Sequence, residues 1–451
     1  MKIQKQVPLT EGPILKSLTG LAVPIMISSF LGTLYNITDM AWIGLLGSKA
    51  VAAVGVGGMY VWLSQGLASL ARMGGQVHVA QCLGRGDKEQ AHRYAKTAVQ
   101  LSILLGLAFA AVSLLFTDPL VGFFKLEGVK TILDAKIYMR ITCGLILFSF
   151  LNLTLTGLYT AQGDSKTPFV ANFIGLLINL LLDPLLILGV GPFPRIEVAG
   201  AAVATVSAQF VVMFVMMVGV FRSKKEENVL KGIRLFEPFS KEELGNICKI
   251  GGPTAIQGMV YCMISMVLTR MVAAFGAEAI ATQRVGGQIE SVSWNTADGF
   301  AAALNAFVGQ NYGAKKMDRV QKGYRISFWT VAIWGALIML AFIIFPGPIA
   351  GVFFHEEKAM EIAISYLIII GFSEAFMCVE LMTIGALSGL GKTKLCSVIS
   401  ITATSMRIPL AMVLSRTSLG LDGIWWALTL TSVAKGIIFY LTFRYQMREK
   451  C

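Results

Sequence analysis

Two carboxylates stand in stretches of sequence that are otherwise apolar. Asp39 follows Tyr35 by four residues, and Asp183 follows Asn179 by the same interval, so each pair shares one helical face. A charged side chain in hydrocarbon costs at least about 2.5–3.5 kcal/mol on insertion scales, so each carboxylate needs a compensating role. If the two stretches pack together, two carboxylates, an amide and a phenol converge. Such a group can hold a hard cation or a proton, and this predicts coupling to an ion gradient.

Two other stretches carry polar side chains along a single helical face. Steps of three or four residues separate the members of each set. The first set is Trp62, Gln65, Ser69, Arg72 and Gln76, and the second is Arg284, Gln288, Ser291, Asn295 and Asp298. In a membrane such faces contact water or protein. We interpret them as candidate walls of a substrate cavity, with interhelical hydrogen bonding as the open alternative.

The second half of the chain has further polar residues in apolar sequence. Four of them are charged, and they are Glu374, Glu380, Arg407 and Lys435. Their opposite signs predict ion pairs between helices, and contact with substrate is the alternative. Gln257, close to Pro253, is one more candidate for the substrate cavity.

Twelve apolar stretches must position these side chains. A helix needs about 20 apolar residues to cross a bilayer, and the expected spans are 17–45, 53–82, 96–117, 138–161, 168–189, 199–221, 250–275, 280–308, 325–346, 362–389, 395–414 and 423–443. The chain is 55% hydrophobic and 14% charged, with a mean hydropathy of +0.69, whereas a soluble domain is about a quarter charged. The sequence therefore predicts an all-α membrane protein.

The spans fall into two copies of one unit. Pro24 and Pro253 are separated by 229 residues, and Gln81 and Gln310 by the same number. We expect an N-terminal six-helix bundle (1–221), a cytoplasmic linker (222–249) and a C-terminal six-helix bundle (250–451). The second copy has Leu268 where the first has Asp39, so the carboxylate site belongs to the first copy alone.

The basic residues indicate orientation and partners. The net charge is +12, and most Lys and Arg fall in alternate loops, which predicts cytoplasmic termini and the lipid bilayer, not nucleic acid, as the partner. The cysteines have no CxxC spacing, and no HExxH or serine-elbow motif occurs, so neither a cofactor nor an enzymatic activity is expected. Nothing indicates an obligate protein partner.

With these repeats, the linker, Pro24 and Asp39, the chain resembles the multidrug and toxic compound extrusion (MATE) family along its whole length, and its DinF-like branch in particular. The resemblance implies the MATE/MOP fold, twelve transmembrane helices in two bundles related by a pseudo-two-fold axis. It implies cation coupling, with Na⁺ or H⁺ held in the N-terminal bundle. The ligands would be Asp39, Asn179, Asp183, Thr205 and the carbonyl of Ala201.

The resemblance also assigns supporting roles. Tyr35 would belong to the surrounding hydrogen-bond network, and Pro24 would be the hinge of the first helix. The NorM-like and eukaryotic branches use an acidic residue in the seventh helix, whereas this chain offers only Gln257 near Pro253.

The function expected is export of amphipathic, cationic organic compounds by an antiporter of the cell inner or plasma membrane, in exchange for H⁺ or Na⁺, by alternating access. The alternative is a flippase for lipid-linked oligosaccharides. A flippase cavity needs a cationic lining. Here the candidate cavity has two basic residues, Arg72 and Arg284, against three acidic ones, Asp39, Asp183 and Asp298, so it fits a flippase less well.

Overall fold

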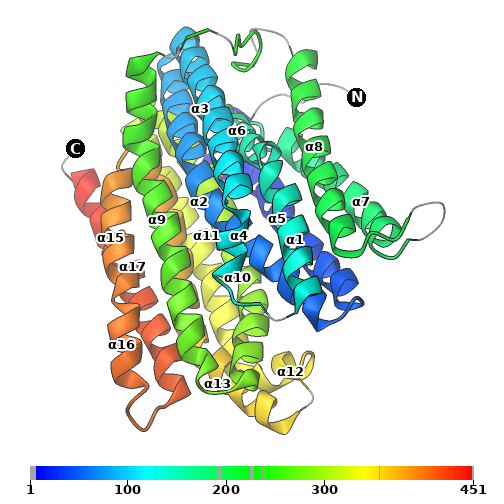
Figure 1. Ribbon diagram of the computed structural model, residues 1–451. Helices are drawn as coiled ribbons and strands as arrows, with labels where there is room; N and C mark the ends of the chain where they lie inside the picture. Colours follow the sequence, from blue (N-terminus) through cyan, green and yellow to red (C-terminus); the bar gives the residue numbers. More distant parts are fainter. Residues whose placement is uncertain are drawn as a thin grey trace. The chain divides into compact units, whose positions relative to one another are not determined.

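The computed structural model describes residues 7–126, 128–189, 194–223, 228–235, 237–238, 240–354 and 356–448. Over these residues the chain forms seventeen helices and no strand (Figure 1). They are α1 (Ile14–Gly44), α2 (Ser48–Arg85), α3 (Lys88–Leu115), α4 (Thr117–Gly122), α5 (Val129–Gly144), α6 (Leu147–Ala161), α7 (Lys166–Ile187), α8 (Glu197–Arg222), α9 (Lys241–Ala273), α10 (Ala277–Gly313), α11 (Met317–Ile344), α12 (Pro346–Gly351), α13 (Glu357–Gly371), α14 (Glu374–Gly389), α15 (Thr393–Ser405), α16 (Arg407–Leu414) and α17 (Leu421–Arg448).

Each predicted span overlaps one of these helices or a neighbouring pair, although some helices begin earlier, as α9 does at Lys241, inside the predicted linker. Within the described ranges, nine helical segments are long and apolar enough to cross a membrane, and one of them, Thr393–Leu414, comprises α15 and α16. Two bent pairs, α5–α6 and α13–α14, bring the number to eleven. The twelfth is α10, which has 37 residues but lower hydropathy because it carries the polar stripe beginning at Arg284. The chain is an all-α, multi-pass membrane protein.

The sequence did not predict the two bends. α5 and α6 meet at 42°, and α13 and α14 meet at 50°. Each break follows a glycine, Gly144 or Gly371, that packs closely against the preceding long helix, at Leu114 or Phe342 respectively. Glycine weakens a helix interior, and the close packing occupies the space that a side chain would need.

The internal repeat is visible helix by helix. α3 and α11 each have 28 residues, and each is followed by a six-residue helix, α4 or α12. The chain turns from α2 into α3 in a short loop. Gly86 takes a left-handed conformation with φ of 80°, and the Asp87 side chain caps α3 by accepting from the Gln90 N–H at 2.9 Å.

The chain divides into two compact units whose boundaries lie inside helices. The first unit contains Ile27–Gly258, and the second contains Pro8–Met26 and Met259 onward. The expected division at 1–221, 222–249 and 250–451 differs from this in two ways. The linker segment belongs to the first unit, and the start of each repeat's first helix belongs to the other repeat's unit.

Local contacts explain this exchange. Before α1, the carbonyl of Leu9 accepts from the Asn311 amide at 3.0 Å, and the Arg319 guanidinium donates to the carbonyl of Gly12 at 2.8 Å. These contacts lie within the second unit. In the first unit, Gly251 of α9 lies against the backbone of Leu70 in α2, where any side chain would collide. The first halves of α1 and α9 are therefore held by the unit opposite to their second halves.

Candidate functional site

The carboxylates of the first unit are positioned by α1, α7 and α8. α7 packs closely along α8 because small residues line the contact. A side chain added at Gly200 would lie 2.6 Å from the carbonyl group of Leu186. An apolar cluster that includes Ile43, Ile187 and Ala201 closes the site on one side. This packing brings the polar faces of α1, α7 and α8 together.

The predicted coupling residues are buried and linked to one another. The Asn179 amide donates to Asp183 Oδ1 at 3.2 Å, and the Tyr35 hydroxyl donates to Thr205 Oγ1 at 3.0 Å. Asp39 is 8% exposed, and Asp183 is completely buried. The two carboxylates are close enough to interact electrostatically. The structure thus brings together the residues that the sequence placed in one site, and Ala201 lies one helical turn before Thr205 in α8.

Two carboxylate oxygens in this site have no hydrogen-bond partner. They are Asp39 Oδ1 and Asp183 Oδ2, and both are buried. Leaving a buried acceptor unsatisfied is costly, and more so when it is charged. Among the described residues no group of three or more His, Cys, Asp or Glu side chains is placed to hold a metal ion. Two carboxylates with neutral oxygen donors suit a proton or a hard cation such as Na⁺.

Tyr138 of α5 is a member of the site that sequence reasoning missed. It is buried, interacts electrostatically with Asp39 and Asp183, and hydrogen-bonds Thr205. Its ring fills the space that a side chain at Gly57 would occupy, and in the second repeat the ring of Tyr366 packs against Gly286 in the same way. The matching Gly and Tyr positions in the two repeats are the signal that could have identified it.

The polar stripes divide between the two units. Gln65, Ser69, Arg72 and Gln257 lie in the first unit, and Arg284, Gln288, Ser291, Asn295 and Asp298 lie in the second. Ser69 and Ser291 donate to backbone carbonyls of their own helices, those of Gly66 and Gln288, both at 2.6 Å. Gln65, Arg284 and Gln288 are exposed, whereas Asn295 is buried. A shared substrate cavity remains a prediction.

One of these side chains holds a buried, unpartnered group. Arg72 is half-buried in α2, and its Nε has no hydrogen-bond partner. The side chain packs against Gly157 of α6. Its environment is therefore protein, which agrees with the rule that polar faces in a membrane avoid lipid.

Comparison with known proteins identifies the family. The MatE family model matches residues 24–185 and 253–413, which correspond to the two repeats. The chain belongs to the MatE family. A probable multidrug resistance protein NorM of Thermotoga maritima is 29% identical over 98% of this chain and 95% of its own length. An FAD transporter of Shewanella oneidensis is 24% identical over 96% and 95%.

Solved structures agree with the MatE assignment. A MOP superfamily transporter from Pyrococcus furiosus is 25% identical, with a TM-score of 0.88 over 99% of both chains. A MATE protein in a straight conformation is 24% identical, with a TM-score of 0.90 over 99% of both chains. The fold is therefore the MATE/MOP fold of two six-helix bundles. Assignment to the DinF-like branch stays a prediction.

The second unit of this MatE protein contains another buried polar cluster. Lys435 Nζ lies 2.8 Å from Glu380 Oε1, and both side chains are 6% exposed, which confirms an ion pair expected from the sequence. Arg407 instead donates to Thr431 at 3.0 Å and to Ser432 at 2.9 Å. Interactions within the unit therefore explain part of this cluster, because Lys435 pairs with a carboxylate and Arg407 bonds two hydroxyl groups.

Glu290 of α10 joins this cluster and was missed from sequence. The Tyr366 hydroxyl donates to Glu290, and Glu290 interacts electrostatically with Arg407 and with Glu374. Glu374 is 1% exposed, and its Oε2 has no hydrogen-bond partner. Glu290 neighbours Ser291 but lies off the polar stripe, so helical spacing alone did not select it.

Proposed function

We propose that this MatE protein is a secondary active multidrug efflux antiporter, which exports amphipathic organic cations in exchange for H⁺ or Na⁺. The observation that carries the proposal is the buried pair Asp39 and Asp183. Each has one carboxylate oxygen without a hydrogen-bond partner, and within the described residues neither forms an ion pair. A transported H⁺ or Na⁺ would supply the missing interaction.

Binding of the ion changes the charge of the site, and this is the basis of coupling. With the site empty, two buried carboxylates repel each other, and an ion relieves the repulsion. Na⁺ would be held by Asp39, Asn179 and Asp183, with Thr205 and the carbonyl of Ala201 as further oxygen donors. Ion and drug must favour opposite conformations for exchange to occur, because coupling requires a difference in affinity between states.

Helix α1 connects the site to a conformational change. Pro24 lies three residues before Ile27, where α1 passes from the second unit to the first. Proline removes a helical hydrogen bond and lowers the cost of bending. We propose that ion binding at Asp39 bends α1 at Pro24 and releases the drug outward, with the polar stripes of α2 and α10 lining its path.

The wider setting follows the same proposal. The protein would lie in the cell inner or plasma membrane with both termini in the cytoplasm, as the basic loops predict. It would need no cofactor, no nucleic acid and no obligate protein partner, and it would not be an enzyme. A flippase role is not favoured, since the two relatives compared above are named as a multidrug resistance protein and an FAD transporter.

Efflux of a fluorescent cationic dye from proteoliposomes tests the proposal. A proton gradient and a sodium gradient are imposed separately, on wild type, Asp39→Asn and the exposed control Asp318→Asn. We expect one gradient to drive efflux in wild type and control but not in Asp39→Asn. Glu374→Gln, in the second unit, should retain gradient-driven efflux. Efflux that survives Asp39→Asn and fails in Glu374→Gln would move the coupling site to the second unit.

A further inference from the structure

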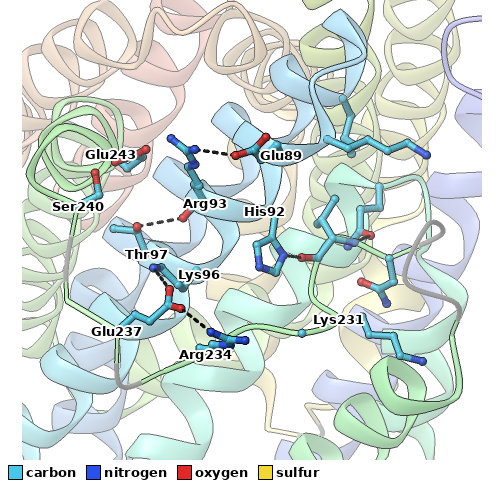
Figure 2. A pocket seen from close by; sticks show the side chains of 16 residues that line it. Glu89, His92, Arg93, Lys96, Thr97, Lys231, Arg234, Glu237, Ser240 and Glu243 are labelled. Atoms are coloured by element: carbon cyan, nitrogen blue, oxygen red, sulfur yellow. Dashed lines mark hydrogen bonds and ion pairs between the residues drawn. The ribbon is translucent and has the colours of Figure 1, made fainter.

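The first unit contains a cavity whose lining includes none of the predicted coupling residues. It has a volume of about 740 Å³ and lies between the start of α3 and the segment joining α8 to α9 (Figure 2). The end of α2, the loop after α6 and the first turn of α9 complete its wall. Sites for small molecules have volumes of about 300–1,000 Å³. The cavity is therefore large enough for a metabolite or a lipid headgroup.

Hydrogen bonds hold the wall in place. His92 Nδ1 donates to the carbonyl of Val229 at 2.6 Å, and the Val229 N–H donates to the Gln162 side chain at 3.0 Å. Gln100 of α3 donates to the carbonyls of Leu235, at 2.9 Å, and Glu237, at 2.7 Å. Val229, Leu235 and Glu237, which precede α9, are thus bonded to α3. A site built this way is ordered before a ligand arrives, which lowers the entropic cost of binding.

The lining has an excess of positive charge. Its described residues include three carboxylates, Glu89, Glu237 and Glu243, against five cations, Lys88, Arg93, Lys96, Lys231 and Arg234. Two of these carboxylates are already in ion pairs. Glu89 binds Arg93 at 2.6 Å, and Glu237 binds Lys96 at 2.8 Å and Arg234 at 3.6 Å.

Lys231 forms no ion pair with the three carboxylates of the lining, so its positive charge is not neutralised there. Its Nζ donates to the carbonyls of Phe221 and Ser223, which are neutral groups. Lys88 also lines the cavity, and the two ammonium groups favour an anion as the ligand. A phosphate group would offset this excess of positive charge, as a monoester in full or as a diester in part.

The opposite side of the cavity has a carboxylate, Glu243, with an oxygen that accepts no hydrogen bond from the described residues. Glu243, in the first turn of α9, is 4% exposed, and its Oε2 is buried without a hydrogen-bond partner. Figure 2 shows it beside Ser240, across the cavity from Lys231. A hydroxyl or ammonium group on a ligand would satisfy this oxygen. The ligand therefore needs an anionic end and a donor end.

We propose that this cavity binds a phosphate ester that carries a hydroxyl or amino group. The phosphate would lie against Lys88 and Lys231, and the donor group would bond Glu243. Two sources share this chemistry, a phospholipid headgroup and a soluble phosphorylated metabolite. A bound phosphate ester would fasten the segment between α8 and α9 to α3, and so would stabilise the first unit independently of drug or coupling ion.

Calorimetric titration with sn-glycerol 3-phosphate tests the soluble source. The full-length protein in detergent is used as wild type, Lys231→Gln, Lys88→Gln, Glu243→Gln and a control, Lys322→Gln. Lys322 is exposed in α11, 229 residues after Arg93, at the matching place in the second repeat. We expect saturable binding to one site, weakened at least tenfold in the three cavity variants and unchanged in the control.

Thermal unfolding in nanodiscs tests the lipid source. Nanodiscs of phosphatidylcholine alone are compared with nanodiscs containing phosphatidylglycerol. If the headgroup is the ligand, phosphatidylglycerol raises the unfolding temperature of wild type and Lys322→Gln but not of Lys88→Gln. The same unfolding curves show that each variant is folded. Equal responses of all variants to both probes, or no response to either probe, would overturn the proposal, whatever the outcome of the dye-efflux experiment.

Discussion

Replacing Lys435 by Met should destabilise the second unit by leaving Glu380 buried without its cation. The two side chains are 2.8 Å apart and 6% exposed, so little water can take the place of the lost ammonium group. One carboxylate oxygen, Glu380 Oε2, already lacks a hydrogen-bond partner. The variant therefore adds an unpaired charge to a position that is already incompletely satisfied.

The magnitude follows from the opposing electrostatic terms. At 2.8 Å and an effective dielectric constant of about 20, the attraction is about 6 kcal/mol. Taking each ion out of water costs several kcal/mol, so the intact pair contributes little net stability. Removing one partner keeps the cost of the other, which predicts a loss of about 3–5 kcal/mol in the free energy of unfolding. The double variant Lys435→Met with Glu380→Leu removes both costs, and should lie within about 1.5 kcal/mol of wild type.

The free energy of unfolding is measured by SDS titration in mixed micelles, followed by tryptophan fluorescence. The exposed pair Lys358–Glu278, at 3.3 Å with side chains 70% and 33% exposed, is the control. Lys358→Met should cost less than about 1 kcal/mol because solvent screens exposed pairs. If the double variant is as unstable as Lys435→Met alone, then packing and not an unpaired charge explains the loss, and the reasoning is refuted.

Three further outcomes are expected. Gly286→Ala should lower the free energy of unfolding by about 1–3 kcal/mol because the new methyl group meets the ring of Tyr366. Combined with Tyr366→Leu, which also removes a donor to Glu290, it should cost less than the sum of the two single losses; an additive effect would contradict this. Asn179→Ala should slow gradient-driven dye efflux and raise the ion concentration for half-maximal rate, because it removes the amide donor of Asp183; an unchanged ion dependence would exclude this role. The Lys96 ammonium lowers the pKa of the Glu237 carboxyl, so their contact should protect the segment before α9 from protease at neutral pH. This protection should be lost as the pH falls through that lowered pKa, and Glu237→Gln should remove the pH dependence.

Much of the architecture could be predicted because lipid imposes simple demands on sequence. Span length and hydropathy located twelve membrane helices, including α10, whose polar stripe was visible in its helical spacing. Helical spacing placed Tyr35 with Asp39, and Asn179 with Asp183, on shared faces, since these pairs are local. The opposite signs of Glu380 and Lys435 predicted their ion pair.

Other features depend on contacts between distant segments, which spacing within one helix cannot show. Tyr138 joins the predicted coupling site, and the absence of a side chain at Gly57 leaves room for its ring. Glu290 reaches Tyr366 from a position off the polar stripe of α10. The bends after Gly144 and Gly371 required knowledge of which neighbour packs against each glycine.

The exchanged first halves of α1 and α9 bear on how a duplicated gene could yield this protein. A single ancestral repeat, folding alone, would have to fill with its own first helix the place that another copy's helix fills today. Two copies could complete each other by trading these segments, as in domain swapping. Once the two copies were fused, the exchanged segments would remain in place within one chain. Fragments cut between α8 and α9 should accordingly fold well only when produced together, each supplying the opening segment that the other lacks.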